Sequence, residues 1–190
     1  MVAFVHASEM TLRAKDTVLI IIDVQERLAP AMDTELYERL LANVARLVVG
    51  TGALGVPVIV TEQYPKGLGI TVAALREVLG EMSPYEKMVF SAAKDDGIAQ
   101  RLRALGRSTA VIVGMETHVC VYQTARDLAA TWKIHVPKDA VASRTHENFE
   151  VGLDLIRQAG GIVTSTETVL FDLLERAGTD AFRVVSKLVR

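Results

Sequence analysis

The chain contains one cysteine, Cys120, and its position is the first indication of chemistry. It lies in Gly114-Met115-Glu116-Thr117-His118-Val119-Cys120-Val121, after the apolar run 109–113 and before a helical pattern over 122–130. A strand that ends in a glycine turn and leads into a helix brings a side chain to the edge of a sheet. The helix N-terminus there favours negative charge, so we expect a thiolate, which is a nucleophile, to be less costly than elsewhere. The alternative is that Cys120 is a small buried apolar residue, as lone cysteines usually are.

Two charged residues, Asp23 and Lys87, are expected at the same edge of the sheet. Asp23 closes the apolar run 17–22, and Lys87 lies in a short extended segment. A carboxylate at the end of a buried strand needs a partner, and Lys87 is a reasonable one. Taken singly, Asp23 could cap the turn that follows it, and Lys87 could be a solvated surface charge. Together with Cys120 they suit nucleophilic catalysis, in which the lysine stabilises the thiolate and the aspartate moves a proton.

The elements that must position these residues alternate along the chain. Apolar runs predict strands over 17–23, 56–61, 86–90, 109–113, 133–137 and 162–165. Helical patterns are expected over 33–50, 72–79, from 95 or 96 to 106, 122–130, 147–159 and 167–175. Strict alternation predicts an α/β fold: a three-layer, doubly wound, Rossmann-like and mostly parallel sheet of about six strands, with helices on both faces. We expect one domain over 1–190, with an N-terminal extension, 1–15, and a C-terminal tail, 177–190, that covers either its own sheet or a neighbouring subunit.

Composition limits the class of partner. The 190 residues are 50% hydrophobic and 5% aromatic, and the formal net charge is −2, with Lys and Arg scattered. A nucleic-acid partner is therefore not expected. No segment approaches the roughly 20 apolar residues that span a bilayer, and the first ten residues lack the pattern of a signal peptide. A single cysteine cannot form an intrachain disulfide, which fits the cytoplasm.

Several segments together resemble the isochorismatase-like cysteine hydrolases, a group that includes nicotinamidases and N-carbamoylsarcosine amidase. They are Ile22-Asp23-Val24-Gln25, Lys87 with Phe90-Ser91, the segment 114–121 with Thr124-Ala125-Arg126-Asp127-Leu128, Asp139-Ala140-Val141-Ala142-Ser143-Arg144, and Thr164-Ser165-Thr166-Glu167. The resemblance runs from about residue 16 to residue 174. Within the family, the segment 61–69 looks most like the branch called isochorismatase domain-containing proteins.

The resemblance implies roles for particular residues. Asp23, Lys87 and Cys120 would form the catalytic triad. The Met115–Glu116 peptide would be cis, and the backbone N–H groups of Glu116 and Cys120 would form the oxyanion hole. Gln63, Tyr64 and the side chain of Glu116 are plausible substrate contacts. Family members are commonly dimers or larger, so a homo-oligomer is expected.

One departure from the family concerns metal. Nicotinamidases carry an aspartate and paired histidines after the second strand, whereas this chain has Gln63-Tyr64-Pro65-Lys66-Gly67. The four histidines, His6, His118, His135 and His146, show no ligand spacing. We therefore expect no metal and no other cofactor, and nicotinamide is not favoured as substrate. His118 lies two residues from Cys120, so the two side chains should diverge rather than form a dyad.

These features predict a hydrolase that cleaves a carbon–nitrogen bond of a small amide-like molecule through a Cys120 acyl-enzyme. Three alternatives stay open at this point. One is vinyl-ether hydrolysis of the isochorismatase type, carried by Asp23. Another is a catalytically idle binding or scaffold protein. The third is a redox-sensing thiol, limited to mixed disulfides because no second cysteine is present.

Overall fold

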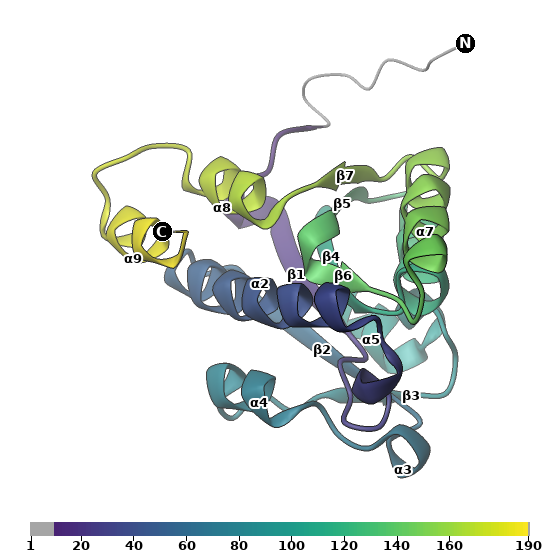
Figure 1. Cartoon of the computed structure of the whole chain (residues 1–190). Coiled ribbons are helices and arrows are strands. Elements are labelled where there is room, and N and C mark those ends of the chain that lie inside the picture. The colour runs from purple at the N-terminus through teal and green to yellow at the C-terminus, as the bar shows by residue number, and fades with distance from the viewer. Residues whose placement is uncertain (1–9, 190) are drawn as a thin grey trace.

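A computed structural model describes residues 10–189, and in this range seven strands form one sheet (Figure 1). The strand order is β3-β2-β1-β4-β5-β7, and β6 pairs with β4. Every pairing between these strands is parallel. The expectations about residues 1–9, including His6, lie outside the described residues. The strands are β1 (Thr17–Ile22), β2 (Val58–Gln63), β3 (Tyr85–Lys87), β4 (Thr109–Met115), β5 (Lys133–Pro137), β6 (Val141–Ala142) and β7 (Ile162–Thr164).

Helices cover both faces of the sheet. Helix α2 lies across one face, and α4, α8 and α9 pack against it, while α6 and α7 pack together on the other side. Five helices begin at a side chain that accepts a backbone N–H, which satisfies a donor of the first turn. The helices are α2 (Thr34–Ala53), α3 (Pro65–Leu68), α4 (Ala73–Leu79), α5 (Asp96–Leu105), α6 (Tyr122–Leu128), α7 (His146–Gln158), α8 (Thr166–Leu174) and α9 (Asp180–Leu188).

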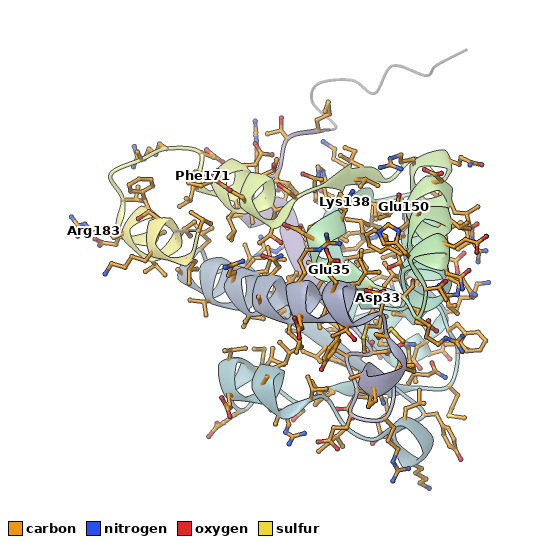
Figure 2. The ribbon with its side chains drawn as sticks, in the orientation of Figure 1. Asp33, Glu35, Lys138, Glu150, Phe171 and Arg183 are labelled. Carbon is orange, nitrogen blue, oxygen red and sulfur yellow. The ribbon has the colours of Figure 1, made fainter. Side chains whose placement is uncertain are left out.

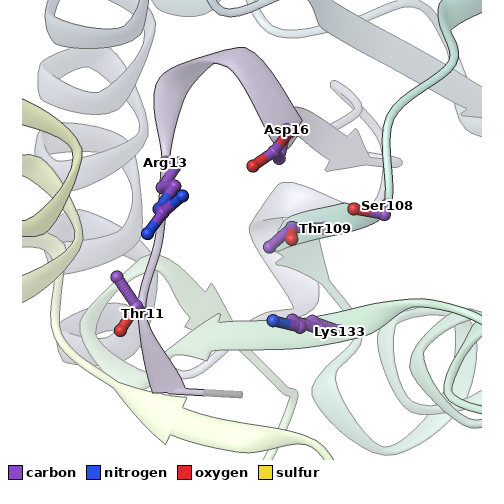
Figure 3. A pocket seen from close by; sticks show the side chains of 6 residues that line it. All are labelled: Thr11, Arg13, Asp16, Ser108, Thr109 and Lys133. Atoms are coloured by element: carbon purple, nitrogen blue, oxygen red, sulfur yellow. The ribbon is translucent and has the colours of Figure 1, made fainter. Parts of the chain in front are cut away.

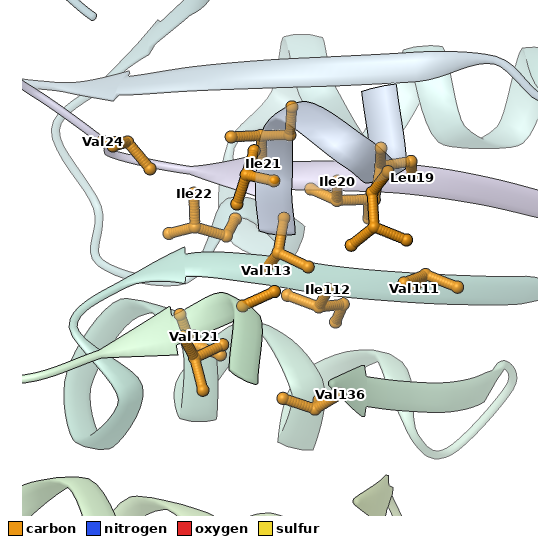
Figure 4. Close-up of a cluster of buried hydrophobic side chains, with 14 of the residues drawn as sticks. Leu19, Ile20, Ile21, Ile22, Val24, Val111, Ile112, Val113, Val121 and Val136 are labelled. Carbon is orange, nitrogen blue, oxygen red and sulfur yellow. The ribbon is translucent and has the colours of Figure 1, made fainter. Parts of the chain in front are cut away.

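The two central strands, β1 and β4, form the middle of the core (Figure 4). Every residue of both strands is buried, which is why they are continuous apolar runs rather than alternating ones. Fully burying one such aliphatic side chain contributes about 1.5–3 kcal/mol. The core therefore fixes β1 and β4 side by side and, with them, the residues that follow their carboxyl ends.

The strand order reverses between β1 and β4. From β1 the chain proceeds to β2 and β3, and from β4 it proceeds to β5 and β7 on the opposite side. Loops at such a reversal separate and leave a crevice at the carboxyl ends of the strands. Gly114 allows the close approach here: its φ is +114°, and an added Cβ would lie 2.0 Å from the carbonyl oxygen of Ile22.

The elements differ from the sequence prediction mainly at their ends. Strand β2 begins at Val58 rather than Val56, and helix α2 continues three residues beyond Gly50. The C-terminal tail forms α9, which packs against α2 of its own chain and buries Val185. Gly50 permits the close packing of α8 on α2, because an added Cβ would overlap the side chain of Leu170, whereas Val185 of α9 would lie at an ordinary contact distance of 3.6 Å.

Candidate active site

Asp23 and Lys87 form a buried ion pair at the carboxyl ends of β1 and β3. Lys87 Nζ lies 2.7 Å from Asp23 Oδ2, and the side chains are 0% and 1% exposed. Asp23 Oδ1 accepts a hydrogen bond from Thr61 Oγ1 at 2.7 Å. Asp23 itself has φ +51°, a conformation unusual for an aspartate, which turns the chain immediately after β1. The carboxylate is thus held on both of its oxygens.

The ammonium of Lys87 is enclosed by acceptors. Besides Asp23, it donates to Gln63 Oε1 at 2.8 Å and to the carbonyl oxygens of Val89 and Phe90 at 3.2 and 3.1 Å. An ammonium has three donors, so these four oxygens more than satisfy it. A buried ion pair is tolerated only when its remaining donors and acceptors are satisfied in this way.

Gln63 is fixed from two directions. Its Nε2 donates to the carbonyl oxygen of Met88 at 2.9 Å, so its Oε1 must be the atom that faces Lys87. Its backbone N–H and C=O both bond to the side chain of Gln25, at 2.8 and 3.0 Å, and the Gln25 amide also donates to Gly69 O at 2.6 Å. Gln25 is fully buried. The sequence prediction placed Gln63 at the substrate, whereas in the structure its amide is engaged by Lys87 and Met88.

Cys120 lies within a π-helical turn, Thr117–Val121, between β4 and α6. Its side chain is buried. Burial raises the pKa of the thiol from its ordinary value of 9.0 to about 12; the neighbouring Asp23 carboxylate raises it further, and Lys87 lowers it. Burial and Asp23 therefore oppose the thiolate that the sequence favours, and Lys87 supports it. The resting thiolate stays a prediction.

Glu116 adjoins the cysteine turn, and its side chain is occupied. Its Oε2 accepts from the backbone N–H and from Nε of Arg144, at 3.1 and 3.0 Å. Its charge also contributes to raising the pKa of Cys120, so it lies near the thiol. The Met115–Glu116 peptide is cis, as the resemblance implies.

His118 and Tyr64 differ in their surroundings. His118 Nδ1 is 3.1 Å from Ser143 Oγ, which gives this histidine a partner other than Cys120. Tyr64 has φ +39°, begins helix α3, and is 47% exposed, with its ring against Gly67. Tyr64 is thus accessible to a ligand, and its role as a substrate contact stays a prediction.

Metal ligands are not grouped in the part of the chain that the structure describes. No three His, Cys, Asp or Glu side chains there lie in an arrangement that could hold a metal ion. None of the described helices is long and apolar enough to cross a membrane. A polar cavity of about 250 Å³, lined by Thr11, Arg13, Asp16, Ser108, Thr109 and Lys133, lies at the opposite edge of the sheet, by the amino ends of β1, β4 and β5 (Figure 3).

The geometry joins one buried carboxylate to a lysine and a thiol at a strand-order reversal, and the sequence agrees with a known family in the same region. Residues 17–168 match the family described as Isochorismatase domain. The chain belongs to the isochorismatase family. The match includes Asp23, Lys87 and Cys120 and extends beyond them to the start of α8.

Individual members of the isochorismatase family share about a third of the sequence. Isochorismatase domain-containing protein 1 of Salmo salar is 34% identical over 92% of this chain and 61% of its own length. This chain thus spans about three fifths of that relative. Isochorismatase domain-containing protein 2 of Danio rerio is 34% identical over 94% of this chain and 89% of its own length. A solved structure described as the MAR1 ribonuclease of Caenorhabditis elegans is 34% identical, has a TM-score of 0.87, and aligns over 94% of this chain and 92% of its own.

Three positioning residues were not identified from the sequence: Gln25, Thr61 and Arg144. All three lie in segments that carry the family resemblance, but none of them was assigned a role from the sequence. The hydrogen bonds of Gln25 to residue 63 join the turn after β1 to the end of β2, 38 positions apart. The signal available was that Gln25 and Thr61 are polar residues next to apolar runs, where a buried polar group requires a partner.

Proposed function

We propose that this protein is a metal-independent cysteine hydrolase that cleaves a carbon–nitrogen bond of a small amide-like substrate. Membership of the isochorismatase family supports a hydrolase. The observation that carries the finer proposal is the buried Asp23 carboxylate, which binds Lys87 at 2.7 Å and lies close enough to the thiol of Cys120 to raise its pKa. A scaffold protein would gain nothing from this arrangement, since a buried ion pair costs desolvation that apolar residues would not.

In the proposed first step, Sγ of Cys120 attacks the substrate carbonyl carbon while its proton passes to Asp23. The raised pKa of Cys120 makes this coupling necessary, because a free thiolate is scarce near neutral pH. The ammonium of Lys87 remains charged and holds the aspartate in place throughout. The negative charge on the carbonyl oxygen would be stabilised by the backbone N–H groups of Glu116 and Cys120, and each such donor contributes about 3–4 kcal/mol in comparable sites.

The tetrahedral intermediate then expels the amine, which takes the proton from Asp23, and a thioester remains on Cys120. Water attacks this thioester and gives its proton to Asp23. The carboxylic acid product leaves, and the proton returns to Sγ as the thiol is restored. The steps consume one water for each carbon–nitrogen bond, and they need neither an oxidant nor a metal. A cytoplasmic location and a homo-oligomer, dimer or larger, belong to the same proposal.

The test is intact-mass spectrometry of the protein mixed with a panel of small amides and stopped at short times. A substrate should add the mass of its acyl group to the wild-type chain, and the adduct should be absent from Cys120→Ala. Since Cys120 is the only cysteine, an adduct that persists in Cys120→Ala would refute the cysteine route. Single-stranded RNA is tested separately, by gel electrophoresis, because its cleavage would leave no acyl adduct; one relative of known structure is described as a ribonuclease.

A second candidate function is vinyl-ether hydrolysis. The raised pKa of Cys120 supports it, because this reaction does not need a thiolate. A protonated thiol is a poor nucleophile until Asp23 takes its proton, whereas Asp23 could act on an ether without the thiol. Turnover of isochorismate that survives Cys120→Ala and disappears in Asp23→Asn would select this route. Loss of all turnover in Cys120→Ala would exclude it.

A further inference from the structure

A second polar cavity, of about 220 Å³, lies on the α2 side of the sheet. Its walls come from α2, from the turn Lys138–Ala140, from the start of α8 and from Val189, directly after α9. Figure 2 shows Lys138 beside the first turns of α2, so the turn 138–140 and α2 form two adjoining walls. For comparison, an engineered cavity of about 150 Å³ holds benzene, so the space admits a small molecule. The residues that matter here are Arg39, Asn43, Arg46, Asp139, Thr166 and Glu167.

Arg39 has donors without acceptors. Its Nε and Nη2 atoms are buried and have no hydrogen-bond partner among the described residues. The guanidinium is held over the ring of Phe149, with Cζ 5.7 Å from the ring centroid. Nε and Nη2 form one edge of the guanidinium, with two parallel N–H bonds that match the two oxygens of a carboxylate. Buried donors of this kind are rare in folded proteins and indicate a missing partner.

Arg46 places a second cation on the same wall, two turns further along α2. Its Nη1 donates to Asn43 Oδ1 at 2.8 Å, and Asn43 Nδ2 donates to the backbone oxygen of Asp139 at 2.9 Å. This chain of hydrogen bonds ties α2 to the neighbouring turn and keeps Arg46 at the cavity. Two arginines on one wall would attract an oxyanion.

The opposite wall of the cavity carries two negatively charged carboxylates. Asp139 Oδ1 accepts from the backbone N–H and the hydroxyl of Thr166, at 2.8 and 3.0 Å, and Glu167 lies in the first turn of α8. A simple dianion would be repelled by these two carboxylates. A molecule with a carboxylate at one end and a hydrogen-bond donor at the other would suit both walls.

We propose that this cavity binds a small organic acid of the amino-acid or hydroxy-acid class. The carboxylate of the ligand pairs with Arg39 and Arg46, and its amino or hydroxyl group donates to Asp139 or Glu167. Because the Nε–Nη2 edge of Arg39 is enclosed in the free protein, its guanidinium turns toward the cavity as the ligand enters. The proposal is independent of the proposed hydrolase chemistry, since it uses none of the residues around Cys120.

The test is nuclear magnetic resonance of the ¹⁵N-labelled full chain, observing the arginine Nε–H signals. The Arg39 signal is assigned by its disappearance in Arg39→Met. We expect a saturable shift of this signal on titration with L-alanine, and a dissociation constant at least tenfold weaker in Arg46→Met. Arg103→Met, on the exposed side of α5, is the matched control and should bind as the wild type does.

Acetate carries only the carboxylate, and ethanolamine carries only the hydrogen-bond donors, so these two compounds separate the outcomes. A weaker dissociation constant for both than for L-alanine supports the proposal. A shift that follows ionic strength alone, and is equal with sodium chloride, would overturn it, as would equal affinity for acetate and L-alanine. If Arg39→Met does not fold, the Arg46→Met titration and thermal stabilisation of the wild type by L-alanine decide the matter.

Discussion

Lys87 Nζ and Asp23 Oδ2 lie 2.7 Å apart, with both side chains almost wholly enclosed, at the ends of strands that are not neighbours in the sheet. Strand β2 separates β1 from β3, and its residues Thr61 and Gln63 hold the aspartate and the lysine respectively. The ion pair therefore spans the carboxyl end of β2. Because Asp23 raises the pKa of Cys120 and Lys87 lowers it, the charges of this pair influence the reactivity of the cysteine.

Alkylation by iodoacetamide should be slow in the resting protein near neutral pH. The pKa of Cys120 is raised to about 12, mainly by burial, so the thiolate fraction stays small and the rate should climb without a plateau through pH 10. The measurement is the alkylation rate against pH, followed by intact mass. A plateau below the ordinary thiol pKa of 9.0 would mean that the resting site holds a thiolate.

Asp23→Asn should change alkylation and turnover in opposite directions. The charge of Asp23 raises the pKa of Cys120, and the substitution removes that charge. The pKa should therefore fall, and alkylation at pH 8 should become faster. Turnover should fall by at least about 100-fold, since the proton acceptor for the attack is lost. A fall in both the alkylation rate and turnover would instead indicate that the variant has disrupted the site. Thermal unfolding would show whether the variant is still folded.

Gln63→Met should act through Lys87. Methionine has a similar volume but cannot accept from the ammonium, so Lys87 keeps three of its four acceptors and is held less firmly beside Asp23, at a cost of at most about 1.5–3 kcal/mol. We expect kcat to fall about 10- to 100-fold with KM little changed, a factor of ten being about 1.4 kcal/mol. Because Lys87 lowers the pKa of Cys120, alkylation should also slow. The exposed Gln158→Met is the matched control. A rise in KM alone would restore Gln63 to the substrate-contact role predicted from the sequence.

The strands that position the site could be predicted because buried parallel strands are apolar and end abruptly. Strands β1 and β4 follow this rule, and the doubly wound order followed from their alternation with helices. Strand β6 was missed because two residues carry no periodicity, and their pairing with Gly114 and Met115 is decided by tertiary position. The same limit applies to α9, whose place against α2 is decided by tertiary packing that buries Val185.

The sequence identified which residues form the candidate site better than it predicted the pKa of Cys120. The need of Asp23 for a partner follows from its place after an apolar run, and Lys87 is that partner in the structure. The pKa of Cys120 could not be judged from sequence, because the helix N-terminus and Lys87 favour the thiolate while burial and Asp23 oppose it. Only the enclosure of the thiol decides which effect prevails.

Cys120→Ala should make the protein less sensitive to alkaline conditions. With the pKa raised in the folded state, the wild type holds a proton on Cys120 that the unfolded chain loses above about pH 9, so this stability is present below pH 9 and is lost as pH rises toward 12. At about 1.4 kcal/mol per pH unit, the upper limit of the loss is about 4 kcal/mol. Urea unfolding at pH 7, 9 and 10.5 checks this as a difference between the two proteins. An identical decline in both would contradict the raised pKa.

Gly152→Ala and Gly52→Ala should have opposite effects, although both glycines are helical. An added Cβ at Gly152 in α7 would lie 2.7 Å from the backbone of Thr117 and His118, so the turn that carries Cys120 would have to shift. We expect a loss of about 1–3 kcal/mol in stability, together with altered alkylation of Cys120. Gly52 in α2 has nothing within 4 Å of an added Cβ, and alanine there should stabilise the fold by about 0.5–1 kcal/mol. Urea unfolding and alkylation of both variants test the pair. Unchanged alkylation in a folded Gly152→Ala would show that α7 does not position the cysteine turn.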